Sequence, residues 1–544
     1  MPGADETTHS DGGPTALEGD VLHSRVRSGV LWSGASVILM RFSNIALMVV
    51  VARIVVPAEF GTFTTALVVH AMLVSIAELG VSAAIARSDL DPDEIAPTVA
   101  TISIVTSLVL ASGMAVFASQ LAQLLGTPGA TEPLRILAIT VALIGPFAVP
   151  GAQLQREFRQ RTLFEANLAS FVVSSAVLLV LAFVGDGAVA FAWSRVAGYV
   201  VMGALMLRGV SRIYRPGFAA ERFRPLLRFA LPLAGANLLS QLLLNVDYVF
   251  VGRLAGPAQL GIYTLAFNIA AWPLAVMGSI LNGVVLPAIS NLRQHGGDLA
   301  SAVAGSTRTV TVVAFPISAM TMALASPLVA TLYGPRWLEA VQVLRVLSLY
   351  GAIFVVCLLF ANIIIAMGRT GTLLGVQAAA LVVLAPAIAL GINRMGLVGV
   401  GAAHIAVIVL VTLPVYLLAV RRSTGAAVRE LVRAATPAVS SSLVAGAVAL
   451  LVSAGVDVAP VGLVLGGLGG LVVYVLAMAP YLVALLPNTV ALPGLVRVVA
   501  NWVACRWSWL GLLSDPDVTS TAPSSGQGWS SESGPRAAVK RREG

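Results

Sequence analysis

The chain has 544 residues, of which 58% are apolar and 11% are charged, whereas ordinary soluble domains carry about 25% charged residues. This composition excludes a cytosolic enzyme, whose surface would need more charge, and a disordered chain, which is rich in charge. The net charge of +8 is modest, and Cys357 and Cys505 lie too far apart in the sequence to suggest a disulfide framework or a metal site. We therefore expect a membrane protein that uses no metal, no cofactor and no nucleic acid.

Fourteen apolar segments are long enough to cross a bilayer as helices, which takes about 20 residues each. The first follows a stretch with five acidic residues and is too long for a signal peptide, so we do not expect it to be cleaved. The weakest is 134–151, which is short and bounded by Pro133 and Pro150. The predicted segments are 28–52, 61–86, 96–118, 134–151, 165–184, 187–207, 226–251, 261–286, 309–332, 341–367, 371–393, 396–420, 436–454 and 461–486.

The distribution of arginine between the predicted loops indicates how the chain is oriented in the membrane. With residues 1–27 on the inside, the internal loops and the segment ends beside them hold seventeen Arg, and the external loops and the segment ends beside them hold six. The bias alternates nearly loop by loop, and a missed or an extra helix would disrupt that alternation. We therefore predict an all-α integral membrane protein of about fourteen helices, with both termini cytoplasmic.

The predicted loops are all too short to hold an extramembrane domain. Residues 488–512 combine apolar and basic residues with three tryptophans, which predicts an interfacial helix or, alternatively, a short membrane dip. Residues 513–544 are rich in Ser, Gly and Pro, which predicts a disordered tail. The other predicted parts are a cytoplasmic segment at 1–27, an N-lobe at 28–207, a basic cytoplasmic linker at 208–225, a C-lobe at 226–420 and two further helices at 436–486.

Two stretches at an offset of 200 residues are similar to each other. Residues 52–66 read ARIVVPAEFGTFTTA and residues 252–266 read GRLAGPAQLGIYTLA. Each follows the first segment of a group of six predicted helices, so the two groups have the same orientation. Parallel repeats of this kind are typical of transporters, whose substrate site lies between the halves. The identical positions are Arg53/Arg253, Pro57/Pro257, Ala58/Ala258, Gly61/Gly261, Thr64/Thr264 and Ala66/Ala266.

Several motifs resemble those of the oligosaccharide flippases in the multidrug/oligosaccharidyl-lipid/polysaccharide exporter superfamily. The string GVLWSGASVILMRFSNIALMVVVARIVVPAEFG carries the Trp-Ser and the Ala-Arg-x-x-x-Pro-x-x-Phe-Gly pattern found at the start of these proteins. The resemblance covers residues 28–370 well and 371–486 more loosely, and it is closest to flippases for capsule or colanic-acid-type polymers. The further matches are ELGVSAAIAR (78–87), IYRPGF (213–218), NVDYVFVGRLAGPAQLGIYTLAFN (245–268), LPAISNLR (286–293) and YGPRWLEAVQVLRVLSLYG (333–351).

The resemblance implies a V-shaped bundle that alternates between inward-open and outward-open states. Its implied cargo is an undecaprenyl-pyrophosphate-linked oligosaccharide, carried from the inner to the outer leaflet of the bacterial plasma membrane. Membrane lipids and the polysaccharide polymerase or export machinery are the partners it suggests.

The sequence contains no nucleotide-driven motor, because the motif GxxxxGK[ST] needs a lysine and the only lysine is Lys540. We therefore expect that the protein is not an enzyme. We expect its transport to be driven by an ion gradient or by downhill flow of the cargo. The alternatives left open are a multidrug or organic-cation antiporter and a non-transporting scaffold for envelope assembly. A membrane glycosyltransferase or polymerase would need a longer external loop than any predicted here.

Arg41 is the candidate for binding the pyrophosphate, because it lies near the middle of segment 28–52 and guanidinium groups suit phosphate oxygens. Asn44, three residues on, shares its helix face. The alternative is that Arg41 only locks helices together by pairing with Glu78 or Asp247.

A polar stripe of three amides marks the segment 226–251. Asn237, Gln241 and Asn245 follow each other at intervals of four, and Gln241 is the repeat partner of Arg41. We expect this stripe to line the cavity and contact sugars, although amides also join membrane helices.

Four charged residues are candidates for ion coupling or gating. Glu78 and Asp247 could each bind a coupling proton or cation, but the sequence favours a structural pair between Asp247 and Arg253. Arg53 and Arg253 begin external loops, which indicates capping or gating on the outer side. Outside this set, His70 and His404 read as helix–helix hydrogen-bond partners, and Arg195, at the start of segment 187–207 near the outer face, stays undecided.

Overall fold

The computed structural model describes residues 43–78, 92–157, 159–185, 187–281 and 285–485, and this part of the chain is helical with no β-strand. Arg41, the predicted interfacial segment 488–512 and the predicted tail 513–544 lie outside it. Ten described helices are long and apolar enough to cross a membrane, or eleven if one bent pair counts as a single span. The chain is therefore an all-α, multi-pass membrane protein, and the number fourteen stays a prediction.

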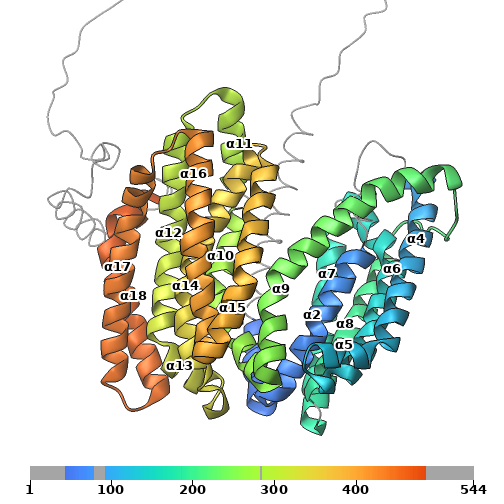
Figure 1. The fold of residues 1–544 in the computed structure, drawn as a ribbon, viewed down its shortest axis with the longest axis horizontal. Coiled ribbons are helices and arrows are strands. Elements are labelled where there is room, and N and C mark those ends of the chain that lie inside the picture. The colour runs from blue at the N-terminus through green and yellow to red at the C-terminus, as the bar shows by residue number, and fades with distance from the viewer. Residues whose placement is uncertain (1–42, 79–91, 158, 186, 282–284, 486–544) are drawn as a thin grey trace, which may run out of the picture. The chain divides into compact units, whose positions relative to one another are not determined.

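The first half of the chain contributes helices that pack in pairs, α4 on α6 and α7 on α8 (Figure 1). We call its described residues 43–209 the N-lobe. Its elements are the helix Ser43–Ile54, α2 (Pro57–Ala77), α4 (Pro92–Val116), α5 (Ala118–Leu124), the 3₁₀ turn η1 (Pro128–Ala130), α6 (Thr131–Arg156), α7 (Gln160–Val184) and α8 (Gly187–Gly209).

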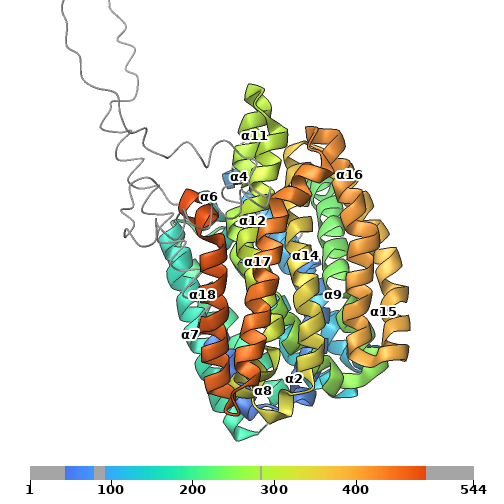
Figure 2. The ribbon, with the colours of Figure 1, turned by 90° about the vertical axis from the view of Figure 1, so that its left-hand side faces the viewer.

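The second half, residues 220–424, is called the C-lobe. It repeats the order of a long helix, a short helix, a 3₁₀ turn and a long helix. Its elements are α9 (Ala220–Ala270), α10 (Trp272–Ile280), α11 (Leu286–His295), α12 (Leu299–Ala323), α13 (Ala325–Leu332), the 3₁₀ turn η3 (Pro335–Trp337), α14 (Ala340–Ala366), α15 (Thr370–Val407), the π-helical turn η4 (Ile408–Thr412) and α16 (Leu413–Thr424). Two further helices follow, α17 (Val428–Ala454) and α18 (Ala459–Leu485), and α17 packs against α12 (Figure 2).

Two glycines interrupt the longest helices in or directly beside the external loops that the sequence predicts. Gly256 lies inside α9 with φ +82°, and Gly396 lies inside α15 with φ +59°. Side chains with a Cβ rarely adopt these left-handed values, so glycine permits each break. Each of these long helices therefore contains one predicted segment and the first part of the next.

The short segment predicted at 134–151 is wrong in its extent, because α6 runs over 26 residues and contains both Pro133 and Pro150. Pro133 lies in the first turn, where no intrahelical N–H bond is lost. Pro150 lies deeper, and membrane helices tolerate such a proline where neighbouring groups satisfy the freed carbonyl.

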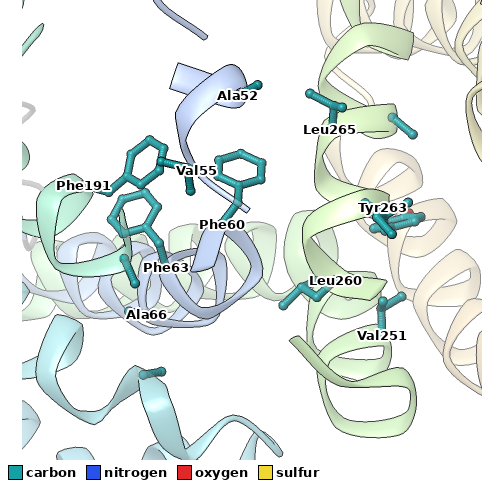
Figure 3. Close-up of a cluster of buried hydrophobic side chains, with 14 of the residues drawn as sticks. Ala52, Val55, Phe60, Phe63, Ala66, Phe191, Val251, Leu260, Tyr263 and Leu265 are labelled. Atoms are coloured by element: carbon teal, nitrogen blue, oxygen red, sulfur yellow. The ribbon is translucent and has the colours of Figure 1, made fainter. Parts of the chain in front are cut away.

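The apolar core joins the two lobes along α2 and α9. Phe60, Phe63 and Phe191 lie together on the N-lobe side, and Leu260 and Tyr263 lie on α9 (Figure 3). The ring centroids of Phe63 and Phe191 are 4.8 Å apart in a stacked arrangement. This packing fixes the helices that enclose the candidate site.

Candidate functional site

A cavity of about 1070 Å³ lies between the two lobes. It is at the upper end of the size range of small-molecule sites, so it can hold a large polar headgroup. Its walls come from the helix Ser43–Ile54, α2, α7, α8, α9 and the start of α10. The lining mixes amides, hydroxyls and aromatic rings, among them Asn44, Asn167, Ser170, Ser174, Asn245, Asn268, Phe60, Phe63, Phe191, Tyr199, Tyr248 and Trp272.

Arg195 on α8 is the one charged side chain among the described lining residues. It is exposed to the cavity, and no carboxylate of the described chain forms a salt bridge with it. His70 of α2 is close enough for the positive charge of Arg195 to act on it, and its Nε2 lies 2.7 Å from Oγ1 of Thr140. The cavity thus presents a guanidinium that no carboxylate of the described residues neutralises, which suits an anion.

The sequence placed Arg195 at a helix start near the outer face and left its role undecided. In the structure it is the ninth residue of α8, about 12 Å along the helix axis from Gly187. The signal that could have found it is its position within a membrane-length segment, because intramembrane charges usually face a cavity or the bundle interior.

The predicted amides divide between the cavity and its surroundings. Asn44 and Asn245 line the cavity, whereas Asn237 and Gln241 are not among its lining residues. Asn245 donates its Nδ2 hydrogens to the backbone oxygen of Gln241 at 2.7 Å and to its side-chain oxygen at 3.3 Å. Gln241 therefore orients a lining residue instead of reaching the cavity itself.

Asp247 does not pair with Arg253, so the predicted structural pair is wrong. The carboxylate accepts a hydrogen bond of 2.7 Å from the hydroxyl of Tyr263, and its Oδ2 lies 3.8 Å from Nε2 of His404. Residues six apart on a helix point in directions about 120° apart, which turns Arg253 away from Asp247. The partner of Asp247 instead comes from α15, about 157 positions later, a distance no local pattern reveals.

The ring of His404 is held in a defined orientation. Its Nδ1 lies 2.9 Å from the backbone oxygen of Val400, and the ring lies edge-on to Tyr350 with centroids 4.9 Å apart. A carbonyl can only accept, so Nδ1 carries a hydrogen and Nε2 is the nitrogen that faces the carboxylate of Asp247. Asp247 and His404 thus form a buried pair of an acidic and a basic side chain.

The remaining candidates for coupling or gating lie outside the cavity lining. Glu78 follows the last turn of α2 and is exposed. Arg53 donates to the backbone oxygens of Thr331 and Leu332 at the end of α13, and Arg253 donates to that of Leu124 at the end of α5. The two arginines therefore contact the opposite lobe.

Two solved structures of membrane transporters are similar in fold to this chain. The chain is similar to the lipid II flippase MurJ in an inward closed conformation, with a TM-score of 0.68 and 15% identity over 82% of this chain and 99% of that one. It is also similar to an inward-facing multidrug transporter of the MATE family and MOP superfamily, with a TM-score of 0.57 and 19% identity over 70% and 94% of the two chains. The fold is that of a transporter built of membrane helices.

The family follows from the sequence comparison. Residues 50–342 match the family described as polysaccharide biosynthesis protein, and the chain belongs to that family. It is similar to the succinoglycan biosynthesis transport protein ExoT of Rhizobium meliloti, at 28% identity over 60% of this chain and 66% of that protein. It is also similar to the lipopolysaccharide biosynthesis protein WzxC of Escherichia coli, at 23% identity over 75% and 84%. A third relative is the teichuronic acid biosynthesis protein TuaB of Bacillus subtilis, at 22% identity over 63% and 72%.

Proposed function

We propose that this protein is a flippase that moves an undecaprenyl-pyrophosphate-linked oligosaccharide across the bacterial plasma membrane for polysaccharide biosynthesis. The observation that carries the proposal is the cavity, where the described lining residues place the guanidinium of Arg195 among amides, hydroxyls and aromatic rings. Arg195 holds the pyrophosphate, since a planar guanidinium can donate to two phosphate oxygens. Asn44 and Asn245 contact the headgroup or the first sugars.

The lining also bears on the organic-cation alternative. A cavity that selects cations needs carboxylates, and the described lining residues include none. The positive charge of Arg195 repels a cationic drug and attracts a phosphorylated lipid. The composition of the cavity therefore favours an anionic, sugar-bearing cargo over a drug.

The direction of transport follows from the predicted orientation. With both termini cytoplasmic, the cargo enters from the inner leaflet, where such lipids are assembled, and leaves to the outer leaflet. Asp247 and His404 are the coupling site in this proposal, because they can gain or lose a proton at the contact between α9 and α15. A change in the charge of this pair alters the attraction between α9 and α15. In this proposal, that change in attraction drives the motion of the C-lobe.

The test replaces Arg195 with alanine and with lysine, and measures the leaflet distribution of the lipid-linked oligosaccharide in cells or vesicles. Arg195→Ala should abolish flipping at normal membrane abundance, and Arg195→Lys should retain part of it because charge survives without the bidentate geometry. Arg208→Ala, an exposed arginine in the last turn of the same helix, is the matched control and should flip normally. Normal flipping by Arg195→Ala would refute the role of this residue.

A further inference from the structure

Arg53 and Arg253, the repeat-related arginines, make reciprocal contacts. Nε of Arg53 donates to the backbone oxygen of Leu332 at 3.0 Å, and the same guanidinium reaches that of Thr331. Arg253 donates to the backbone oxygen of Leu124. Each arginine thus crosses to the last residues of the short helix in the other lobe, α13 for Arg53 and α5 for Arg253.

The chemistry of each contact is that of a helix C-terminus meeting a cation. The last carbonyl groups of a helix have no intrahelical partner and carry a partial negative charge, so a guanidinium satisfies both needs. A left-handed glycine follows each short helix, Gly126 at φ +73° and Gly334 at φ +92°. A Cβ on Gly126 would lie 3.0 Å from Cα of Arg253, so the bare glycine lets the opposite loop come close.

The two lobes also touch backbone to backbone beside these arginines. A Cβ on Gly61 of α2 would lie 1.8 Å from the backbone oxygen of Pro257, and one on Gly261 of α9 would lie 1.9 Å from that of Pro57. A glycine of one lobe meets a proline of the other lobe at both crossings, as expected for halves related by a two-fold axis. No side chain larger than hydrogen fits at either crossing without separating the helices.

A third contact reinforces the closure from one side. The indole Nε1 of Trp337, in η3 of the C-lobe, donates to the backbone oxygen of Ala52 in the N-lobe at 2.8 Å. Trp337 is 1% exposed and meets the edge of Phe60 with centroids 6.0 Å apart. The loops that the sequence predicts to be external are therefore closed over the cavity by packing as well as by hydrogen bonds.

We propose that Arg53, Arg253, Gly61 and Gly261 form the outer gate of the transport cycle. The gate is a pair of arginine clasps and two glycine crossings, and it must come apart before the cavity can open to the outside. It rests on the proposed alternating access but not on the identity of the cargo. Because the two clasps lie on opposite lobes, a hinge motion that separates the lobes at this end breaks both together.

The experiment measures how easily a thiol reagent reaches the cavity from outside intact cells. A chain with Cys357→Ala and Cys505→Ser carries one reporter, Asn268→Cys, on the cavity wall. The probe is a membrane-impermeant maleimide. Adding Arg53→Ala together with Arg253→Ala should raise the labelling rate at least several-fold over the parent, because the closed state loses its clasps.

Two controls separate gate opening from unfolding. A parallel chain that keeps buried Cys357 and lacks Asn268→Cys should stay unlabelled with and without the arginine substitutions. If Cys357 becomes labelled, the glycine variants test the gate instead of the arginine variants. Gly61→Ala should raise the labelling of Asn268→Cys. Gly113→Ala is the control and should not raise it, because a Cβ at Gly113 meets nothing within 4 Å.

Unchanged labelling in both the arginine and the Gly61 variants would overturn the gate. An increase in labelling that is seen only in inverted vesicles would also overturn the gate, because the end of the protein that holds the arginine clasps would then be cytoplasmic. No cargo is needed for the measurement, so the gate and the proposed cargo fail separately: a chain that flips no lipid-linked oligosaccharide can still show gated labelling.

Discussion

Arg195 and Asp247 are both ionisable residues inside membrane-length helices, but their surroundings are opposite. Arg195 is exposed to the cavity and has no carboxylate partner in the described chain. Asp247 is 2% exposed and lies between Tyr263 and His404. A buried charge needs partners because desolvation costs several kcal/mol per ion, whereas a side chain that faces a polar cavity is accessible to water and to a ligand. The difference separates a residue available to the cargo from one that holds helices together.

The comparison predicts that removing the Asp247 side chain lowers the stability of the folded protein far more than removing that of Arg195. Asp247→Ala leaves His404 without its carboxylate and Tyr263 without its acceptor, so it should lower the stability by about 3–5 kcal/mol. Arg195→Ala should change it by less than about 0.5 kcal/mol, because no described partner is left unsatisfied. The melting temperature of the purified protein in detergent measures both.

The pair itself can then be tested by a double substitution. Asp247→Asn with His404→Gln replaces both ionisable side chains with neutral polar groups of similar size, and should recover part of the stability lost in Asp247→Ala. A chain that recovers stability but transports without dependence on the proton gradient would support coupling through this pair. Equal melting temperatures for Asp247→Ala and Arg195→Ala would contradict the comparison.

Tyr263→Phe sharpens the comparison by removing one donor to Asp247 and nothing else. Hydrogen bonds to charged groups contribute about 1.5–3 kcal/mol, so the loss should be smaller than that of Asp247→Ala. Tyr248→Phe is the matched control on the same helix, since its hydroxyl does not bond the carboxylate, and should have little effect. The same melting assay decides, and a loss in Tyr248→Phe as large as in Tyr263→Phe would contradict the assignment.

The smallest effect is expected at an exposed ion pair. Arg212 Nη1 lies 3.0 Å from Oδ2 of Asp93, and the two side chains are 67% and 55% exposed. Such pairs contribute about 0–1 kcal/mol, so Arg212→Ala should leave both stability and transport nearly unchanged.

Tyr214 keeps a second bond to the same carboxylate in that variant. Burial and then the hydrogen bond to Asp93 raise the pKa of Tyr214, so its hydroxyl remains a donor near neutral pH. A large loss of transport in Arg212→Ala would show that the linker after α8 has a role in transport beyond its contact with α4.

The helical fold could be read from the sequence because apolar length alone forces a membrane helix. The repeat at Arg53 and Arg253 could be read as well, since it lies in consecutive residues. Asn44 and Asn245 were found because intramembrane amides are rare enough to be informative. Arg195 was left undecided because the predicted helix start put it near the outer face, whereas the cavity extends along α8 to reach it.

The sequence by itself determined the class of the protein and the repeat that contains Arg53 and Arg253. These are local properties: hydropathy, periodicity and backbone sterics act on neighbouring residues. Only the tertiary structure decided that Asp247 meets His404 instead of Arg253, that Arg195 faces the cavity, and that Arg53 and Arg253 close on the opposite lobe. Those contacts join residues between 129 and 279 positions apart or depend on a helix's rotation about its axis, which packing of the whole bundle fixes.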